Sequence, residues 1–318
     1  MIYCSRLLML LLVTAITAQA QTSRADSAMS YLNRGIEWLT KGEFDKAMTD
    51  FDLAIAFDPR LAQAYYNRGC LQQDKGDLDG AITDYTRVIE INPRHADAFT
   101  NRGIAWVAKG ALDKAIADYD QAINLNPLRP MFYYNRGRVR QATGYLDEAI
   151  ADYTKAIKIS PLLVEAYNNR GIVRFSQGDL ETALADLDVA IKLSPRFAMA
   201  HQNRGLIRQD KQDLDGAMAD FNQAIALDPR LAEAYNSRGI VWSDKGEFDR
   251  SIADFSRAIK LNPQYYGAYA NRGLVRLRQG TEAEARQDFD QCLRLNPKLT
   301  SLLEQRIKEI KQWLATKQ

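Results

Sequence analysis

The amino-acid sequence predicts an all-α protein in which helix pairs stack one after another into a solenoid. Three observations lead to this fold class: a triplet that recurs every 34 residues, a proline that recurs with the same spacing, and a helical pattern of apolar residues between them. A repeat of about 20–50 residues is typical of architectures in which each structural unit packs only against its neighbours.

The triplet Asn-Arg-Gly marks the first half of each unit. It occupies residues 33–35, 67–69, 101–103, 135–137, 169–171, 203–205 and 271–273, and Ser-Arg-Gly replaces it at 237–239. The prolines that share the spacing are Pro59, Pro93, Pro127, Pro161, Pro195, Pro229, Pro263 and Pro297. The sequence therefore contains eight consecutive repeats over residues 28–299. We count repeat positions from Ala28, so that position 1 of each later repeat lies 34 residues further along.

Each repeat contains two segments that we expect to be helical. In the second segment of the first repeat, Phe44, Ala47, Met48 and Phe51 have the i, i+3, i+4, i+7 spacing of an amphipathic helix. A glycine at position 15 separates the two segments in seven of the repeats. The residue before each proline is disfavoured in the helical region, so the second helix should end there.

Two further features of the repeat predict how its helices begin and pack. The acidic residue after the loop glycine, as in Asp77, Asp179 and Asp213, suits an N-cap whose side chain accepts an unpaired backbone N–H. Small residues at positions 8 and 20 should let the paired helices approach closely, with a large ring at position 24 filling the space beside them.

This pattern resembles the tetratricopeptide repeat: aromatic residues at positions 4 and 11, glycine at 8, alanine at 20 and 27, Phe or Tyr at 24 and proline at 32. The resemblance covers 272 of the 318 residues, as eight copies of 34. It implies a right-handed superhelix whose inner groove is lined by the first helix of each repeat. The sequence departs from the family pattern at position 7, which is always Arg, and at His201 and Gln212. It also departs at position 11, where four repeats have Arg140, Arg174, Arg208 and Arg276.

The first twenty residues have the pattern of an export signal. Arg6 precedes a short apolar run over residues 7–16, and Ala18-Gln19-Ala20 is a small-x-small cleavage site. We therefore expect residues 1–20 to be a signal peptide cut after Ala20, and the mature protein to be secreted or periplasmic. The alternative is an uncleaved membrane anchor, although a full span needs about 20 apolar residues.

Two short segments flank the repeats. Residues 21–27 are expected to form an N-terminal linker. Residues 300–318 are expected to form a C-terminal capping helix, because Leu302, Leu303, Ile307, Ile310 and Leu314 lie on one side of a helix that could cover the exposed end of the array.

Asparagine at position 6 is the candidate binding residue. The resemblance places this position in the groove, and a carboxamide offers two donors and an acceptor to the backbone of an extended peptide. The row is similar to the asparagine ladder of some peptide-binding family members. The alternative is that these amides cap or brace neighbouring helices. The candidate residues are Asn33, Asn67, Asn101, Asn135, Asn169, Asn203 and Asn271.

Two sets of arginines suggest other roles. Arg at position 7 and Asp at position 23 are present in every repeat, which predicts a salt bridge between the two helices, within a repeat or across to the next. Arg140, Arg174 and Arg208 recur at position 11 of three consecutive repeats. Their side chains could cover apolar surface with their stems, or could form a basic strip for an acidic partner.

Charge and composition narrow the function. A formal net charge of +2 gives no electrostatic reason to expect nucleic acid as a partner. His95 and His201 lie about three repeats apart, so they cannot share a metal ion or serve one nucleophile. We expect no catalysis, no cofactor and no metal.

The sequence therefore predicts a scaffold or adaptor that binds an extended peptide or protein segment in its concave groove. One alternative is a subunit of a membrane-associated assembly, held at the surface by an uncleaved N-terminus. Another is an accessory protein or sensor for a non-protein ligand, which a large apolar pocket in the groove would favour.

Overall fold

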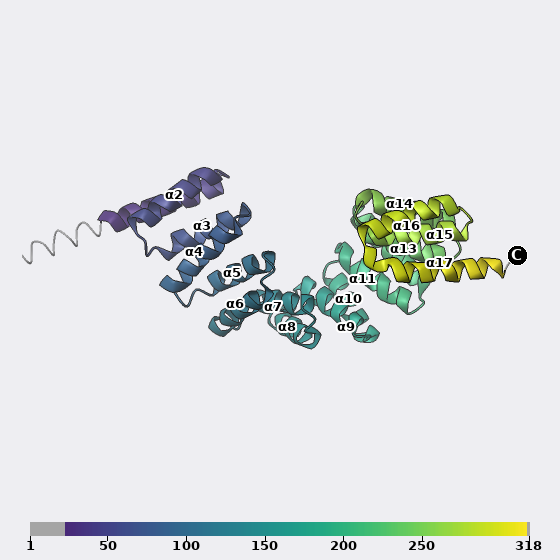
Figure 1. Cartoon of the computed structure of the whole chain (residues 1–318). Helices are drawn as coiled ribbons and strands as arrows, with labels where there is room; N and C mark the ends of the chain where they lie inside the picture. The colour runs from purple at the N-terminus through teal and green to yellow at the C-terminus, as the bar shows by residue number, and fades with distance from the viewer. Residues whose placement is uncertain (1–22, 317–318) are drawn as a thin grey trace, which may run out of the picture. The chain divides into compact units, whose positions relative to one another are not determined.

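The computed structural model describes residues 23–316, and every secondary-structure element in that range is a helix (Figure 1). The predicted signal peptide, residues 1–20, lies outside the described residues. The chain divides into two units, Met1–Pro161 and Leu162–Gln318, and each is considered by itself.

Eight antiparallel helix pairs fit the eight repeats of the sequence. The first helices of the pairs are residues 23–40, α3 (Ala62–Asp74), α5 (Ala96–Ala108), α7 (Pro130–Ala142), α9 (Val164–Ser176), α11 (Ala198–Asp210), α13 (Ala232–Asp244) and α15 (Tyr266–Arg278). The second helices are α2 (Phe44–Phe57), α4 (Leu78–Ile91), α6 (Leu112–Leu125), α8 (Leu146–Ile159), α10 (Leu180–Leu193), α12 (Leu214–Leu227), α14 (Phe248–Leu261) and α16 (Glu282–Leu295). The predicted all-α fold of tandem helix pairs is confirmed.

Of the expected linker at residues 21–27, the structure describes residues 23–27. Residues 23–27 are already helical and continue into the first helix of the array. The physical reason is that Ala25, Ala28 and their neighbours contain neither proline nor glycine, so nothing stops the helix from extending upstream.

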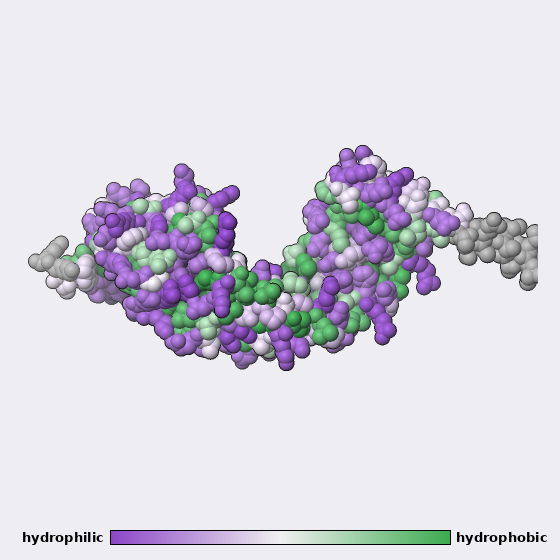
Figure 2. Space-filling model, turned by 180° about the vertical axis from the view of Figure 1, so that it is seen from behind, coloured by the Kyte–Doolittle hydropathy of each residue, from purple (hydrophilic) through white to green (hydrophobic). Residues whose placement is uncertain are grey.

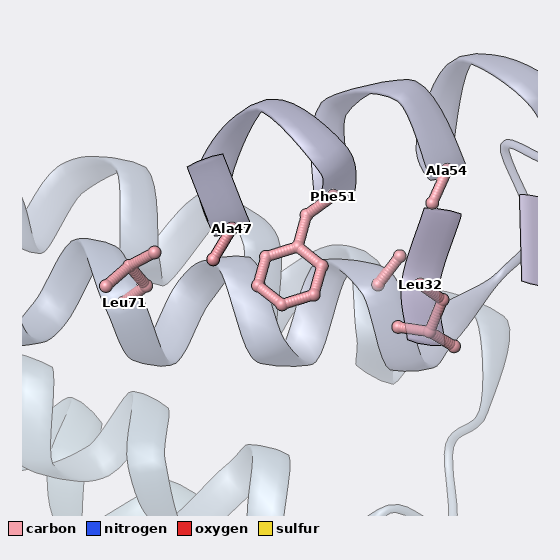
Figure 3. Packing of buried hydrophobic residues seen from close by; sticks show 6 residues of the cluster. Leu32, Ala47, Phe51, Ala54 and Leu71 are labelled. Carbon is pink, nitrogen blue, oxygen red and sulfur yellow. The ribbon is translucent and has the colours of Figure 1, made fainter. Parts of the chain in front are cut away.

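Alanines and aromatic rings of the second helices form the core. Ala47, Phe51 and Ala54 of α2 are completely buried, and they pack against Leu32 of the same repeat and Leu71 of the next (Figure 3). Truncating a buried leucine such as Leu71 to alanine typically costs about 2–5 kcal/mol. Because each core includes a residue from the following repeat, neighbouring pairs stabilise one another.

The small residue at position 8 is required by the ring at position 24. A Cβ atom added to Gly205 would lie 2.6 Å from Cε1 of Phe221, well inside van der Waals contact. In the repeat where leucine replaces the ring, a Cβ on Gly171 would meet Cγ of Leu187 at 3.2 Å. The predicted close approach of the paired helices is confirmed.

The loop between the paired helices uses a left-handed residue at position 15. Seven glycines take this conformation, with φ between 74° at Gly42 and 85° at Gly144. In the sixth repeat Gln212 takes it instead, with φ of 62°, and it is the one non-glycine residue with positive φ in the described part of the chain.

The predicted N-caps are confirmed. The side chains of Asp77, Asp179 and Asp213 accept hydrogen bonds from the backbone N–H of Gly80, Thr182 and Gly216, each three residues later. These contacts fix the start of α4, α10 and α12.

The array ends in a short 3-10 helix, η1 (Pro297–Leu299), followed by α17 (Thr300–Ala315). Leu303 and Ile310 of α17 are buried against Leu277 of α15 and Phe289 of α16. Leu302, expected on the same side of the helix, is instead 55% exposed.

Hydrophilic side chains cover most of the surface in the view of Figure 2, with hydrophobic patches between them. Some of the exposed apolar residues lie on first helices, among them Met29, Ile36, Ile104, Met131 and Met199.

Candidate functional site

The asparagines of position 6 all lie on first helices. Asn33 is exposed, and Asn67, Asn101, Asn135, Asn169, Asn203 and Asn271 are half-buried. None of the seven is fully enclosed, so each retains some contact with solvent.

Three of these amides also brace neighbouring first helices. Within the first unit, Nδ2 of Asn101 donates to Oη of Tyr66 at 3.0 Å. In the second unit, Nδ2 of Asn203 donates to Oδ1 of Asn168 at 2.8 Å, and Nδ2 of Asn271 donates to Oδ1 of Asn236 at 3.0 Å. Each bond joins position 6 of one repeat to position 5 of the repeat before it, so the bracing role that the sequence left open is present in the structure.

The bracing bonds use the side-chain nitrogens of these asparagines and leave their side-chain oxygens unbonded. Within the described residues, the carbonyl oxygens of Asn101, Asn203 and Asn271 accept no hydrogen bond. Asn67 differs, because its oxygen accepts from Nε2 of Gln63 on the same helix at 2.9 Å. Three of the candidate residues therefore combine a held nitrogen with an available acceptor.

Position 5 contributes polar side chains that the sequence did not single out. Asn168, Gln202 and Asn236 are buried on the first helices of the fifth to seventh repeats. Nε2 of Gln202 donates to Oγ of Ser237 at 2.9 Å, and its Oε1 is buried without a partner. The constant spacing of 35 residues between these partners was the signal that could have revealed them.

The predicted salt bridge between positions 7 and 23 is confirmed in all eight repeats. Arg68 is representative: its Nε and one terminal nitrogen donate to the two carboxylate oxygens of Asp84, both at 2.7 Å. The other pairs are Arg34–Asp50, Arg102–Asp118, Arg136–Asp152, Arg170–Asp186, Arg204–Asp220, Arg238–Asp254 and Arg272–Asp288. The hydrogen bonds that Arg68 donates to Asp84 raise the pKa of Arg68, so the guanidinium is permanently charged.

The same arginine reaches the preceding repeat. Arg204 donates to Asp188 at 2.7 Å, and Arg238 donates to Oδ1 of Asn222 at 2.7 Å. Equivalent contacts join Arg102 to Thr86 and Arg272 to Ser256. The arginine of position 7 thus ties together two helices of its own repeat and one of its neighbour.

The arginines of position 11 do not form a free basic strip. Arg140, Arg174 and Arg208 each donate to the position-23 aspartate of their own repeat, at 2.8, 2.7 and 2.8 Å. Arg276 does the same with Asp288 at 2.8 Å. In these repeats one buried carboxylate binds two guanidinium groups, an arrangement that neither interpretation of the sequence included.

Where tryptophan occupies position 11, a cation at position 19 lies over its ring. The distances from cation to ring centroid are 4.7 Å for Lys46 and Trp38, 4.4 Å for Lys114 and Trp106, and 4.8 Å for Arg250 and Trp242. In repeats with arginine at position 11, position 19 is Glu148, Thr182, Gly216 or Glu284. In these seven repeats one positive charge is therefore present at either position 11 or position 19, whereas the second repeat has Gln72 and Gly80 there.

Tyr66 adds an aromatic surface beside the braced amide of Asn101. Its ring lies 4.9 Å from that of His95, centroid to centroid. Burial raises the pKa of Tyr66 to about 12 and also raises the pKa of the neighbouring Cys70 thiol. Both groups are therefore protonated at neutral pH, and Cys70 is a poor nucleophile.

These observations define a helical-repeat scaffold, and comparison with known families agrees. Three family models match: one for the tetratricopeptide repeat at residues 62–95 and 232–265, a second for the same repeat at 266–299, and a third, described as TPR repeat, at 105–144, 142–178 and 205–242. Together the matches cover more than half of the chain. The chain belongs to the tetratricopeptide repeat family, whose fold supports a general role as a protein-interaction scaffold.

Solved structures share the fold at low sequence identity. A tetratricopeptide repeat protein from Parabacteroides merdae is 20% identical with a TM-score of 0.65, over 79% of this chain and 98% of that one. The structure of the APC/C hetero-tetramer Cut9-Hcn1 gives 16% identity and a TM-score of 0.67, over 84% of this chain and 52% of that one. The pilF protein of Pseudomonas aeruginosa is 18% identical with a TM-score of 0.58, over 67% of this chain and 96% of that one. No curated protein matches the chain.

Among the residues that the structure describes, no helix combines the length and the apolar character that crossing a membrane requires.

Proposed function

We propose that this protein is a non-catalytic scaffold that binds an extended peptide or protein segment along the first helices of its repeats. The observation that carries the proposal is the set of position-6 amides whose nitrogens are held by bracing bonds while their oxygens stay available, at Asn101, Asn203 and Asn271. A fixed amide has little freedom to lose when a ligand binds, which favours affinity.

The chemistry of an amide row suits the backbone of a guest. Each carbonyl oxygen can accept from a peptide N–H. The second hydrogen of Nδ2 can donate to a peptide carbonyl at Asn203 and Asn271, whereas at Asn101 it is directed to Sγ of Cys70 at 3.5 Å. Because every peptide has the same backbone groups, such contacts select an extended conformation with little regard to sequence. Exposed apolar residues on the first helices, such as Ile104 and Met131, would add contact area.

The proposal is tested with a triple variant, Asn101→Ala, Asn203→Ala and Asn271→Ala. The immobilised protein is incubated with a random-sequence library of 12-residue peptides, and the recovered peptide is quantified. We expect the triple variant to recover much less peptide than wild type, because each substitution removes the backbone contact of a peptide that lies over that repeat.

The matched control removes the same bracing bonds from their other ends, as Tyr66→Phe, Asn168→Ala and Asn236→Ala. It keeps the position-6 amides, so it should retain most of the binding. Equal losses in both variants would mean that the amides matter only as braces, and equal recovery by the first variant and wild type would refute the ladder.

We also propose that the protein acts after export, with residues 1–20 removed. The apolar run over residues 7–16 and the Ala18-Gln19-Ala20 site support this. N-terminal sequencing of the protein from its native cell should give Gln21 as the first residue. An intact N-terminus in a membrane fraction would favour the alternative, a membrane-held subunit of an assembly.

A further inference from the structure

The end of the second unit contains a cavity that the repeat pattern did not predict. It has a volume of about 770 Å³ and lies between the first helices of the last two repeats and α17. Ile240 of α13, Leu274 of α15 and Ile310 of α17 contribute apolar walls, and Asn271 of the amide row also lines it. The cavity is therefore continuous with the candidate binding face.

Charged groups line this cavity as well as apolar ones. Arg306 and Glu309, both on α17, form an ion pair at 3.6 Å and neutralise one another. Asp244 and Arg278, at the C-terminal ends of α13 and α15, are the remaining charges. One nitrogen of Arg278 makes a long hydrogen bond of 3.4 Å to Oγ of Ser243.

Asp244 has no ionic or hydrogen-bonding partner among the described residues, since no carboxylate–cation distance within 4.0 Å involves it. Burial raises the pKa of Asp244, and the nearby Arg278 only partly opposes this effect. The carboxylate lines the cavity and is still exposed to solvent, and a cation placed beside it would stabilise its charged form.

The side chains of Asp244 and Arg278 differ in their freedom to move. An aspartate side chain is short, so its carboxylate stays where α13 holds it. An arginine has a long flexible stem and can turn its head group into solvent. The fixed charge in the cavity is therefore the negative one, and a positively charged guest can displace the guanidinium of Arg278.

Trp313 of α17 lines the same cavity and is 45% exposed. The face of an indole ring attracts cations, and this protein already uses that contact three times at position 11, most closely at 4.4 Å between Lys114 and Trp106. Apolar walls beside the ring suit the methylene groups of a long side chain.

From this cavity we infer a specificity pocket: it holds one lysine or arginine side chain of the extended segment bound along the first helices. The cationic head pairs with Asp244, and the aliphatic stem packs on Leu274 and Trp313. This inference rests on the proposed function, because the rest of the segment must lie on the amide row.

The test measures the frequency of Lys and Arg in the peptides that the protein recovers from the random library of 12-residue peptides. Wild type should enrich Lys and Arg about fivefold over the input. Asp244→Asn keeps the shape of the side chain and removes its charge, so it should recover peptide without that enrichment. Trp313→Leu, a change on α17 at the same cavity, should reduce the enrichment through a different contact and serves as the second variant.

The matched control is Asp210→Asn, which changes the same repeat position one repeat earlier and lies outside the cavity. It should keep the wild-type enrichment. Peptide recovered by wild type without basic enrichment, or the same enrichment in Asp244→Asn, would overturn the pocket while leaving the scaffold intact. Failure of wild type to recover any peptide would overturn the proposed function and the pocket together.

Discussion

Arg204 and Arg208 bind the same buried carboxylate, that of Asp220. Arg204 donates to both oxygens, at 3.0 and 2.7 Å, and Arg208 adds a third bond at 2.8 Å from one helical turn further along. Asp220 is only 2% exposed, so its charge is stable inside the protein because these two cations surround it. The same double clamp occurs at Asp152, Asp186 and Asp288.

Replacing the clamped carboxylate should destabilise the second unit. Asp220→Asn leaves two guanidinium groups without their counter-charge, and we expect the free energy of unfolding to fall by about 3 kcal/mol. Urea denaturation followed by circular dichroism measures the change. Asp188→Asn is the control, because that carboxylate is 58% exposed and should contribute less than about 1 kcal/mol. Similar losses in the two variants would contradict the clamp.

The positive charge at position 19 of the third repeat should be replaceable by an arginine at position 11, as in the fourth repeat. Trp106→Arg alone places a second cation beside Lys114 and removes a cation–π contact, so it should destabilise the protein by about 1–2 kcal/mol. Adding Lys114→Glu gives positions 11 and 19 the same residues as Arg140 and Glu148 in the fourth repeat. It also lets the new arginine bind Asp118, as Arg140 binds Asp152. A double-mutant cycle by thermal denaturation should give a favourable coupling of about 1 kcal/mol, and strict additivity would refute the replacement.

The cost of a methyl group at position 8 should depend on what stands at position 24. Gly205→Ala pushes a Cβ against the ring of Phe221 and should cost about 2–3 kcal/mol, because buried neighbours must shift. Gly171→Ala places its Cβ 3.2 Å from both Cγ of Leu187 and the backbone oxygen of Ala183, farther than the 2.6 Å to the ring, and should cost less. Equal losses for the two alanines in chemical denaturation would show that the ring does not set the requirement.

Gln212 offers a stabilising substitution. Its φ of 62° strains a residue with a Cβ, and glycine relieves that strain at a smaller entropic cost. Gln212→Gly should raise the free energy of unfolding by about 0.5–1 kcal/mol, seen as a higher melting temperature. Gln209→Gly, within helix α11, should instead lower it by about 1 kcal/mol.

The first repeat should lose stability in acid. Hydrogen bonding to Arg34, opposed by burial, lowers the pKa of Asp50 below its usual value. A carboxyl group with a depressed pKa in the folded state stabilises the protein above its unfolded pKa, and this contribution is lost as pH falls through the folded value. We expect the melting temperature to decline below about pH 4 and to decline less in Arg34→Gln. An identical pH profile for the variant would exclude this pair as a source of the acid sensitivity.

The sequence predicted those features that repeat without exception. The 34-residue period predicted the helix pairs, and the constant Arg and Asp at positions 7 and 23 predicted the salt bridge between the paired helices. The double clamp was missed because arginine occupies position 11 in only four repeats, where it looked like an exposed strip. The bonds from Asn203 to Asn168 and from Asn271 to Asn236 depend on the angle between neighbouring first helices, which spacing alone does not determine. The cavity at Asp244 was missed because the path of α17 across α13 and α15 is not part of the repeat.

The contacts between neighbouring repeats have one property with a wider consequence. Arg204 reaches Asp188 and Arg238 reaches Asn222 across the same 16 residues, while Lys75–Asp45 and Lys245–Asp215 both span 30. A bond defined by a fixed offset can form again after a whole repeat is gained or lost by recombination, wherever the new neighbours carry the same two residue types. Such a chain can change its length in steps of 34 residues and keep the register of these bonds, whereas a deletion of any other length would shift the residues on the two sides of the break out of register.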